Sequence, residues 1–357
     1  MSKKKISHQQ LLKVDRDYRK AAKAAHLTYS SDKKQGISRI KKGKSFKYFF
    51  KNKPIVDKKN IDRIKHLAIP PSWKNVWICP SPFGHIQATG FDLNHRKQYR
   101  YHPRWNELRN ETKFHRLLEF GKALPQLRQK IKKDISQKEL TENKVIAAAI
   151  NLMEQTYIRI GNNGYERLYG SYGLTTLKDN HVNICNDKIT FSFTGKKGIK
   201  HSINLKNKKL ASIVKECRDI PGKELFQYYT PEGKRKKIDS GMVNTYIRNT
   251  SGNNFSAKDF RTWAGSLQAI KYFLTVIDTD SEPDIKKNIL SMLDQVSKKL
   301  GNSRNICRKY YVHPGLINMY EEKRLLQYIR KFNSQKIEGK GLTPEEQLLM
   351  KLLKKCS

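Results

Sequence analysis

Apolar and polar positions alternate in the first third of the chain, and a period of two is typical of strands with one buried face. One stretch departs from it: Ile61, Ile64 and Leu67 share a helical face, which predicts a short helix that ends before the prolines at 70 and 71. We therefore expect a small sheet-rich domain over residues 36–108. The alternating positions are Ile37, Ile40, Phe46, Tyr48, Phe50, Val76, Ile78, Ile86, Ala88 and the run 98–101.

The remainder of the chain, residues 109–357, has mainly helical spacing. Three signals mark helix ends: Ser256 with Asp259 resembles a capping box, Gly301 should stop a helix that runs from Glu282 to Leu300, and Thr343 with Pro344 and Glu346 should begin the last helix. The lysine-rich stretch 128–143 is expected to be a loop or hinge. A further helix stripe leads toward Tyr157 and consists of Val145, Ala148, Ala149, Leu152 and Met153.

Residues 182–205 are the exception in this helical part. Ile189, Phe191 and Phe193 alternate with polar residues, the run 195–198 has turn chemistry, and alternation resumes at Ile199. This pattern predicts a β-hairpin with lysines at its tip. The expected fold class is α+β, with a small antiparallel sheet domain followed by a larger, mainly helical domain that carries one hairpin. Residues 1–35 are basic and are expected to form a flexible amino-terminal arm.

The charge of the chain indicates a polyanionic partner. Lys and Arg total 73 against 32 Asp and Glu, which gives a formal net charge of +41. Nucleic acid is the first candidate, because phosphate neutralisation releases counterions. An anionic membrane is the second, but membrane readers usually concentrate charge on an amphipathic helix or beside a lipid anchor, whereas here it is spread along the chain. No apolar stretch predicts a membrane span or a signal peptide.

Cofactor signals are lacking in the sequence. The five cysteines stand far apart without a Cys-x-x-Cys spacing, so we expect reduced, buried thiols rather than a zinc site or disulfides. No Walker motif predicts ATP binding, and no acidic cluster predicts a two-metal site. We therefore expect neither a cofactor nor a metal.

Two arginines are candidates for binding phosphate. Cleavage of a phosphodiester without a metal needs a nucleophile, cations on the non-bridging oxygens and an acid for the leaving oxygen. Arg159 lies at the end of an apolar helix, where a guanidinium favours an anionic ligand, although by itself a surface arginine or a salt bridge is the simpler interpretation. Arg261 lies in the first turns of a helix and shares a face with Lys258, but Asp259 can equally pair with a neighbouring cation.

Candidates for the acid and the nucleophile follow. Lys196, at the hairpin tip, lies on a mobile turn from which it can reach a leaving oxygen, although solvated lysines on such turns are common. Tyr310 and Tyr311 lie beside Arg308 and Lys309, which can hold a phosphate near a phenol. Local sequence does not choose between the two tyrosines, and two core aromatics at a helix end are the simpler interpretation.

These segments occur in one order that resembles the type IB DNA topoisomerases, in the short bacterial and large-virus form related to the poxvirus enzyme. The resemblance covers nearly the whole chain and implies the fold of the catalytic core that type IB topoisomerases share with tyrosine recombinases. Any single segment is a modest match, and the ordered set is specific. The matching segments include 36–40, 68–73, 84–90, 96–103, 159–162, 173–177, 195–196, 258–262 and 300–302 leading to Tyr311.

The resemblance also implies roles for individual residues. Tyr311 rather than Tyr310 corresponds to the nucleophile, because the family pattern places Val-His-Pro or similar directly after it. Arg159 and Arg261 correspond to the arginines that stabilise the transition state, and Lys196 to the general acid that protonates the leaving 5′ oxygen. The set is completed by Lys258 as a supporting phosphate contact and by Asn302, nine residues before the tyrosine, where the poxvirus-like pattern has histidine.

The resemblance implies a monomer that clamps duplex DNA and relaxes supercoils through a 3′-phosphotyrosine, without ATP or an obligatory metal. Gln98, Tyr99 and Tyr101 resemble positions that contact DNA in the major groove, although the two tyrosines can instead be one core face of a strand. The expected location is the cytoplasm, at the nucleoid or, for a virus, in the virion or viral factory. A tyrosine recombinase and a non-catalytic architectural DNA-binding protein remain the alternatives.

Overall fold

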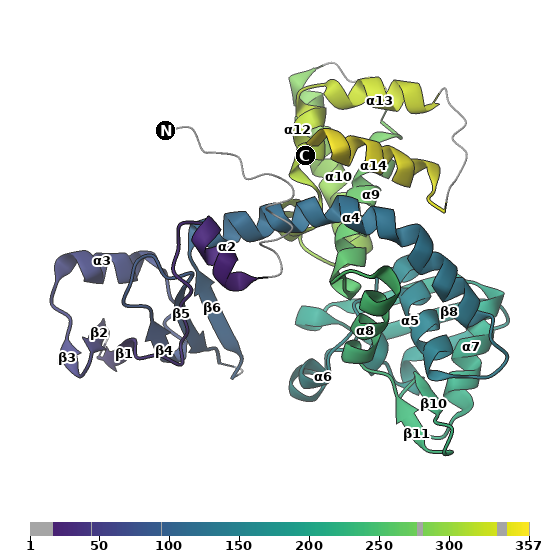
Figure 1. The fold of residues 1–357 in the computed structure, drawn as a ribbon, viewed down its shortest axis with the longest axis horizontal. Helices are drawn as coiled ribbons and strands as arrows, with labels where there is room; N and C mark the ends of the chain where they lie inside the picture. The colour runs from purple at the N-terminus through teal and green to yellow at the C-terminus, as the bar shows by residue number, and fades with distance from the viewer. Residues whose placement is uncertain (1–16, 44, 94, 277–280, 334–340, 357) are drawn as a thin grey trace. The chain divides into compact units, whose positions relative to one another are not determined.

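The computed structural model describes residues 17–43, 45–93, 95–276, 281–333 and 341–356. The chain forms two compact units, one up to Arg116 and one from Leu117 onward. Both contain sheets and helices, which confirms the α+β class (Figure 1). The domain boundaries predicted from the sequence, at residues 35/36 and 108/109, stay a prediction. The boundary at 108/109 and the division at Arg116 both fall inside one helix, α4 (Pro103–Ile135).

The first unit is built on one antiparallel sheet with the strand order β3-β2-β1-β4-β5-β6. Its core contains Ile37, Val76, Ile78 and Ala88 from the strands and Ile64 from the helix packed on them, which confirms the alternating pattern and the short helix. Ile40 is 49% exposed, because its odd spacing from Ile37 turns it to the opposite face. The elements are α2 (Tyr18–Ala24), β1 (Ile37–Lys42), β2 (Ser45–Phe50), β3 (Lys53–Pro54), α3 (Lys58–His66), β4 (Lys74–Ile78), β5 (Ile86–Phe91) and β6 (Lys97–Tyr101).

The described part of the predicted arm is packed. Ala21 and Ala22 on α2 are buried with Leu27 against Trp105 and Leu108. The packing of residues 21–27 argues against flexibility for this part of the predicted arm, because small alanines let the short helix lie close to an aromatic partner that is distant in sequence. Residues 1–16 lie outside the described part of the chain.

The second unit is mainly helical, as the spacing predicted. Its core extends from α4 through the long helices to the last helix, α14. After α4 the helices are α5 (Glu142–Thr156), α6 (Asn163–Tyr169), α7 (Lys208–Asp219), α8 (Ser240–Ser251), α9 (Ala257–Phe273), α10 (Glu282–Leu300), α11 (Arg304–Tyr310), α12 (Pro314–Glu321), α13 (Arg324–Asn333) and α14 (Pro344–Cys356), with short 3-10 turns at η1 (Leu174–Thr176), η2 (Asp179–His181) and η3 (Lys196–Gly198).

The prediction of a loop or hinge over residues 128–143 was wrong. The helix α4 continues to Ile135, and only residues 136–141 connect it to α5. Leu127, Ile131 and Ile135 are buried on one face of α4, while Lys132 and Lys133 are exposed. The lysines therefore cover the solvent side of an amphipathic helix.

The predicted helix ends are confirmed. Ser256 and Asp259 form the capping box of α9, in which the Ser256 amide donates to the Asp259 carboxylate at 2.9 Å. Gly301 ends α10 in the left-handed region at φ 57°. The amide of Thr343 donates to Glu346 Oε2 at 2.9 Å and so caps α14.

The predicted hairpin is present as part of a three-stranded antiparallel sheet. The strands β8 (Lys188–Thr194) and β9 (Lys200–Lys206) pair along their full length, with Phe193 opposite His201. The strand β7 (Val182–Cys185) joins the other edge of β8 and was not predicted. The smaller pair β10 (Gln227–Tyr229) and β11 (Arg235–Lys237) was not predicted either.

The five cysteines are free thiols. Cys79, Cys217 and Cys307 are buried as expected, whereas Cys185 is exposed on β7, which corrects the expectation for that residue. Within the described ranges, no helix is long and apolar enough to cross a membrane, and no group of His, Cys, Asp or Glu side chains has a metal-binding arrangement.

Candidate active site

The turn after α5 positions the first arginine. Helix α5 ends at Thr156, and Tyr157 takes the left-handed conformation at φ 58° and ψ 16°. A side chain with a Cβ rarely adopts this conformation, so surrounding contacts must hold it. Gln268 Nε2 donates to the Tyr157 hydroxyl at 2.9 Å, and the carbonyl of Tyr157 accepts from Arg261. The left-handed turn thus directs the chain toward Arg159 and supplies an acceptor for the second arginine.

Arg261 lies in α9 and is only 5% exposed. Its Nη1 donates to the Tyr157 carbonyl and its Nη2 to the Leu300 carbonyl at 2.7 Å, at the end of α10. Its buried Nε has no hydrogen-bond partner among the residues that the structure describes. Burial lowers the pKa of Arg261, while the nearby Tyr311 oxygen acts in the opposite direction. A buried cation with one unused donor is suited to an anionic ligand.

Arg159 meets the turn that follows α10. Its Nη2 donates to Asn302 Oδ1 at 2.6 Å and to the Gly301 carbonyl at 3.2 Å. Burial and the positive charge of Arg261 lower the pKa of Arg159. Two guanidinium groups this close repel each other, so an anion between them would stabilise both. The simpler interpretations, a surface arginine or a salt bridge, do not describe Arg159.

Asn302 is engaged on both sides of its amide. Its Oδ1 accepts from Arg159, and its Nδ2 donates to the Leu300 carbonyl at 3.2 Å. An amide nitrogen carries two hydrogens, so one remains for a phosphate oxygen. The Asn302 amide therefore holds Arg159 through its oxygen and keeps one N–H donor for a ligand. The sequence did not predict the contact between Asn302 and Arg159.

Lys196 occupies the tip of the β8–β9 hairpin. The turn is closed by hydrogen bonds from the Gly195 amide to the Ile199 carbonyl at 2.7 Å and from the Gly198 amide to the Gly195 carbonyl at 3.1 Å. Burial lowers the pKa of Lys196, and the positive charge of Arg159 lowers it further. The ammonium group is thus within electrostatic range of the arginines.

The two adjacent tyrosines have different surroundings. Tyr310 is 37% exposed at the end of α11, whereas Tyr311 packs in part against the core of the second unit. The Arg261 guanidinium lies over the Tyr311 ring, 5.4 Å from its centre. The backbone of Tyr311 is held by Ser266, whose hydroxyl donates to the Tyr311 carbonyl at 3.2 Å. The structure therefore brings Tyr311 together with Arg159, Lys196, Arg261 and Asn302, and gives Tyr310 no comparable position.

The predicted DNA contacts lie outside this cluster. Lys258 is exposed in the first turn of α9. On β6, the edge strand of the first unit, Tyr99 and Tyr101 are 43% and 38% exposed, and their ring centres lie 5.8 Å apart. The Tyr101 ring also stacks on Trp105 with ring centres 6.5 Å apart, so this tyrosine is both exposed and packed. Gln98 Nε2 donates to Asp92 at 2.9 Å.

Sequence reasoning missed residues that hold the site. His201 on β9, Ser266 and Gln268 on α9, and Tyr157 contact the predicted cluster. Their only sequence signal is proximity to the motifs, because they act through tertiary contacts. The Nδ1 atom of His313 accepts from the Gly315 amide at 3.0 Å and so caps the start of α12.

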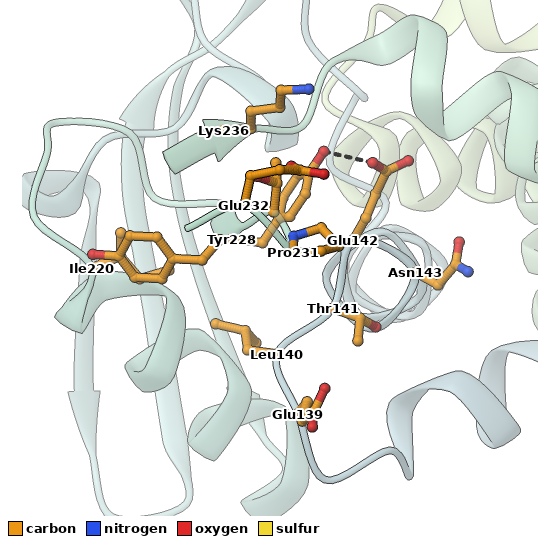
Figure 2. A pocket seen from close by; sticks show the side chains of 12 residues that line it. Glu139, Leu140, Thr141, Glu142, Asn143, Ile220, Tyr228, Pro231, Glu232 and Lys236 are labelled. Atoms are coloured by element: carbon orange, nitrogen blue, oxygen red, sulfur yellow. Dashed lines mark hydrogen bonds between the residues drawn. The ribbon is translucent and has the colours of Figure 1, made fainter. Parts of the chain in front are cut away.

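An open pocket of about 750 Å³ lies elsewhere in the second unit and is lined by residues outside the cluster around Tyr311 (Figure 2). Its walls carry Glu139, Glu142 and Glu232 against one lysine, Lys236. The Tyr228 hydroxyl donates to Glu142 at 2.5 Å. Carboxylates repel a phosphate backbone, so this pocket is not suited to DNA cleavage, in contrast to the cationic cluster around Tyr311.

Comparisons with known proteins agree with this geometry. Residues 102–337 match the family model of the eukaryotic DNA topoisomerase I catalytic core, and residues 45–92 match the bacterial DNA topoisomerase IB amino-terminal domain. The chain is 32% identical to DNA topoisomerase 1B of Acanthamoeba polyphaga mimivirus over 295 residues, which cover 80% of this chain and 88% of the relative. It is 23% identical to DNA topoisomerase 1B of vaccinia virus (strain Copenhagen) over 274 residues, 75% and 84% of the two chains.

The fold, the cationic cluster around one tyrosine and these matches define a topoisomerase I catalytic core. The chain belongs to the type IB DNA topoisomerase family. Its activity is that of this family, an isomerase that changes DNA topology.

Proposed function

We propose that Tyr311 is the nucleophile of a transesterification on duplex DNA. Its hydroxyl oxygen attacks a backbone phosphorus, a bond forms between that oxygen and phosphorus, and the bond from phosphorus to the 5′ oxygen breaks. The phenol proton passes to solvent. The observation that carries this proposal is the position of Tyr311 beside Arg261, with its backbone fixed by Ser266, whereas Tyr310 is exposed.

The two arginines would stabilise the transition state. The Arg261 Nε, which has no hydrogen-bond partner in the described part of the chain, and the guanidinium of Arg159 are donors for the non-bridging oxygens, on which negative charge develops. Both Nη atoms of Arg261 are held by backbone carbonyls, at Tyr157 and Leu300, and Nη2 of Arg159 is held by the Gly301 carbonyl. Donors held in advance need no reorganisation during the reaction.

Lys196 would act as the general acid. Its ammonium group gives a proton to the leaving 5′ oxygen, and its lowered pKa eases this transfer. In the reverse step the 5′ hydroxyl attacks the phosphotyrosine, Lys196 recovers the proton and Tyr311 is released. The phosphotyrosine conserves the energy of the broken bond, so resealing needs no ATP. Rotation of the free 5′ end between the two steps relaxes supercoils.

DNA binding would rest on both units of a single chain. Lys258 would contact a phosphate, and the exposed face of β6 with Tyr99 and Tyr101 would contact the duplex. Gln98 Nε2 donates one hydrogen to Asp92, so base reading through this side chain would use its second amide hydrogen and its carbonyl oxygen. We propose a monomer that clamps the duplex. It would act in the cytoplasm at the nucleoid or, in a virus, in the virion or viral factory.

Plasmid relaxation tests the nucleophile. Tyr311→Phe should abolish relaxation and the covalent protein–DNA adduct while leaving DNA binding nearly intact, and Tyr310→Phe should retain both activities. Relaxation that survives Tyr311→Phe and is lost in Tyr310→Phe would show that the nucleophile is assigned to the wrong residue. Relaxation without partner DNA strands also distinguishes this activity from strand exchange by a recombinase.

A further inference from the structure

His201 lies between the hairpin that carries Lys196 and the turn that follows α10. His201 lies opposite Phe193 in the β8–β9 pair, one residue pair before the turn that contains Lys196. Its ring stacks on Phe193 with ring centres 5.0 Å apart and an angle of 23°. Phe193 is 8% exposed, so the imidazole rests on a buried platform.

Two glycines make room for this ring. A Cβ added to Gly195 would lie 2.6 Å from both Cδ2 and Nε2 of His201, and a Cβ added to Gly301 would lie 2.6 Å from its Cε1. Gly195 directly precedes Lys196, and Gly301 directly precedes Asn302. The imidazole is therefore wedged between the backbone at the lysine turn and the backbone at the turn that binds Arg159.

The His201 ring contacts its neighbours by van der Waals packing. No described side chain forms a hydrogen bond with the His201 imidazole, and the ring borders a cavity of about 20 Å³ together with Lys196 and Arg159. Burial and the positive charges of Arg159 and Arg261 lower the pKa of His201, so the ring is neutral at neutral pH. A neutral, flat ring fills a space in which another cation would be repelled.

We propose that His201 is a positioning residue that sets the Lys196 ammonium group against the leaving 5′ oxygen by fixing the distance between the Gly195 and Gly301 backbones. The inference rests on the proposed role of Lys196 as the general acid. Under this inference His201 supports proton delivery by Lys196, and the arginines stabilise the non-bridging oxygens. Loss of the ring should therefore impair only the step that needs an acid.

The test compares single-turnover cleavage of two duplexes that contain one mapped cleavage site, with either oxygen or sulfur as the 5′ bridging atom. A thiolate leaves without a proton, so sulfur rescues a defect in general-acid catalysis. His201→Ala should cleave the oxygen substrate about 10- to 100-fold more slowly than the wild type, in line with the cost of misplacing a reacting group. It should cleave the sulfur substrate at nearly the wild-type rate, and His201→Phe, which keeps the ring, should be close to wild type on both.

Gly195→Ala probes the same contact from the other side. Gly195 has φ −95°, so its backbone tolerates a side chain, and the His201 ring is the obstacle. Gly195→Ala should be slow on oxygen and rescued by sulfur, and in combination with His201→Ala it should be no slower than His201→Ala alone. This pair also keeps the inference testable if one single variant is unstable.

Two controls separate the possible failures. Lys196→Ala must be rescued by sulfur; if it is not, the general-acid proposal fails, whatever His201 does. Gln268→Leu should slow cleavage through Tyr157 and the arginines, and sulfur should not rescue it. If Lys196→Ala is rescued but His201→Ala is either unimpaired or equally slow on both substrates, the inference about His201 is wrong.

Discussion

The hydroxyl of Ser266 on α9 binds the backbone of Tyr311 directly, through a hydrogen bond to its carbonyl at 3.2 Å. The Ser266 hydroxyl oxygen also accepts from the His313 amide at 3.0 Å, so this one side chain fixes the peptide groups on both sides of Val312. Arg261 lies on the same helix, five residues before Ser266. One helix therefore carries the cation that we propose binds phosphate and also the group that holds the proposed nucleophile.

Gly265, beside Ser266, should not tolerate a side chain. A Cβ at this position would lie 2.6 Å from the Tyr311 carbonyl and 2.7 Å from its Cβ. Gly265→Ala should slow cleavage about 100-fold by displacing the phenol, since a misplacement of about 1 Å can have this effect. Adduct formation in a single turnover measures it. Gly121→Ala, which would collide with Met350 and Trp263, is the control and should lower the melting temperature more than the rate at permissive temperature.

Substitutions of Asn302 should separate its two roles. Asn302→Ala removes the acceptor for Arg159 and should slow cleavage about 100-fold, the lower end of the range for loss of one oriented hydrogen-bonding group. Asn302→Asp keeps the acceptor but places negative charge beside the scissile phosphate, so it should be at least as slow. Single-turnover rates at saturating enzyme decide this. An aspartate variant with wild-type activity would mean that the amide acts only by holding Arg159.

The pH dependence of cleavage should reflect Lys196. Burial and the positive charge of Arg159 lower its pKa below the ordinary lysine value of 10.5. A general acid must be protonated, so cleavage of an oxygen-bridged duplex should decline as pH rises through this lowered value, sooner than an ordinary lysine would allow. With the sulfur-bridged duplex the decline should be absent. Identical alkaline profiles for the two duplexes would contradict the role of Lys196.

The last helix should contribute to stability through Glu346. This carboxylate is 1% exposed and accepts from Arg128 at 2.7 Å and from the Trp263 indole at 3.0 Å, so it ties α14 to α4 and α9. Glu346→Gln should lower the free energy of unfolding by about 2 kcal/mol, as expected for weakening hydrogen bonds to a charged group. Denaturant unfolding measures the change. Glu322→Gln, in an exposed pair with Arg324, should have little effect.

The sequence by itself determined the local structure and the family. Alternation at Phe191 and Phe193 predicted a strand, and the capping residues Ser256 and Gly301 fixed helix ends, because these signals depend on backbone geometry over a few residues. The prediction of a loop at the lysine-rich end of α4 was wrong, because the apolar spacing of Leu127, Ile131 and Ile135 determines the helix there and the lysines only cover its solvent side. The order of the motifs, rather than any one of them, indicated a type IB topoisomerase.

Only the tertiary structure distinguished the surroundings of Tyr311 from those of Tyr310. Both tyrosines have the same neighbours in sequence, but only Tyr311 lies under Arg261 with its carbonyl bound by Ser266. Two further contacts join residues that are about a hundred positions or more apart in sequence. They are the hydrogen bond between Arg159 and Asn302 and the packing of His201 against Gly301. Such contacts depend on how helices and the hairpin pack in three dimensions, and no local pattern encodes them.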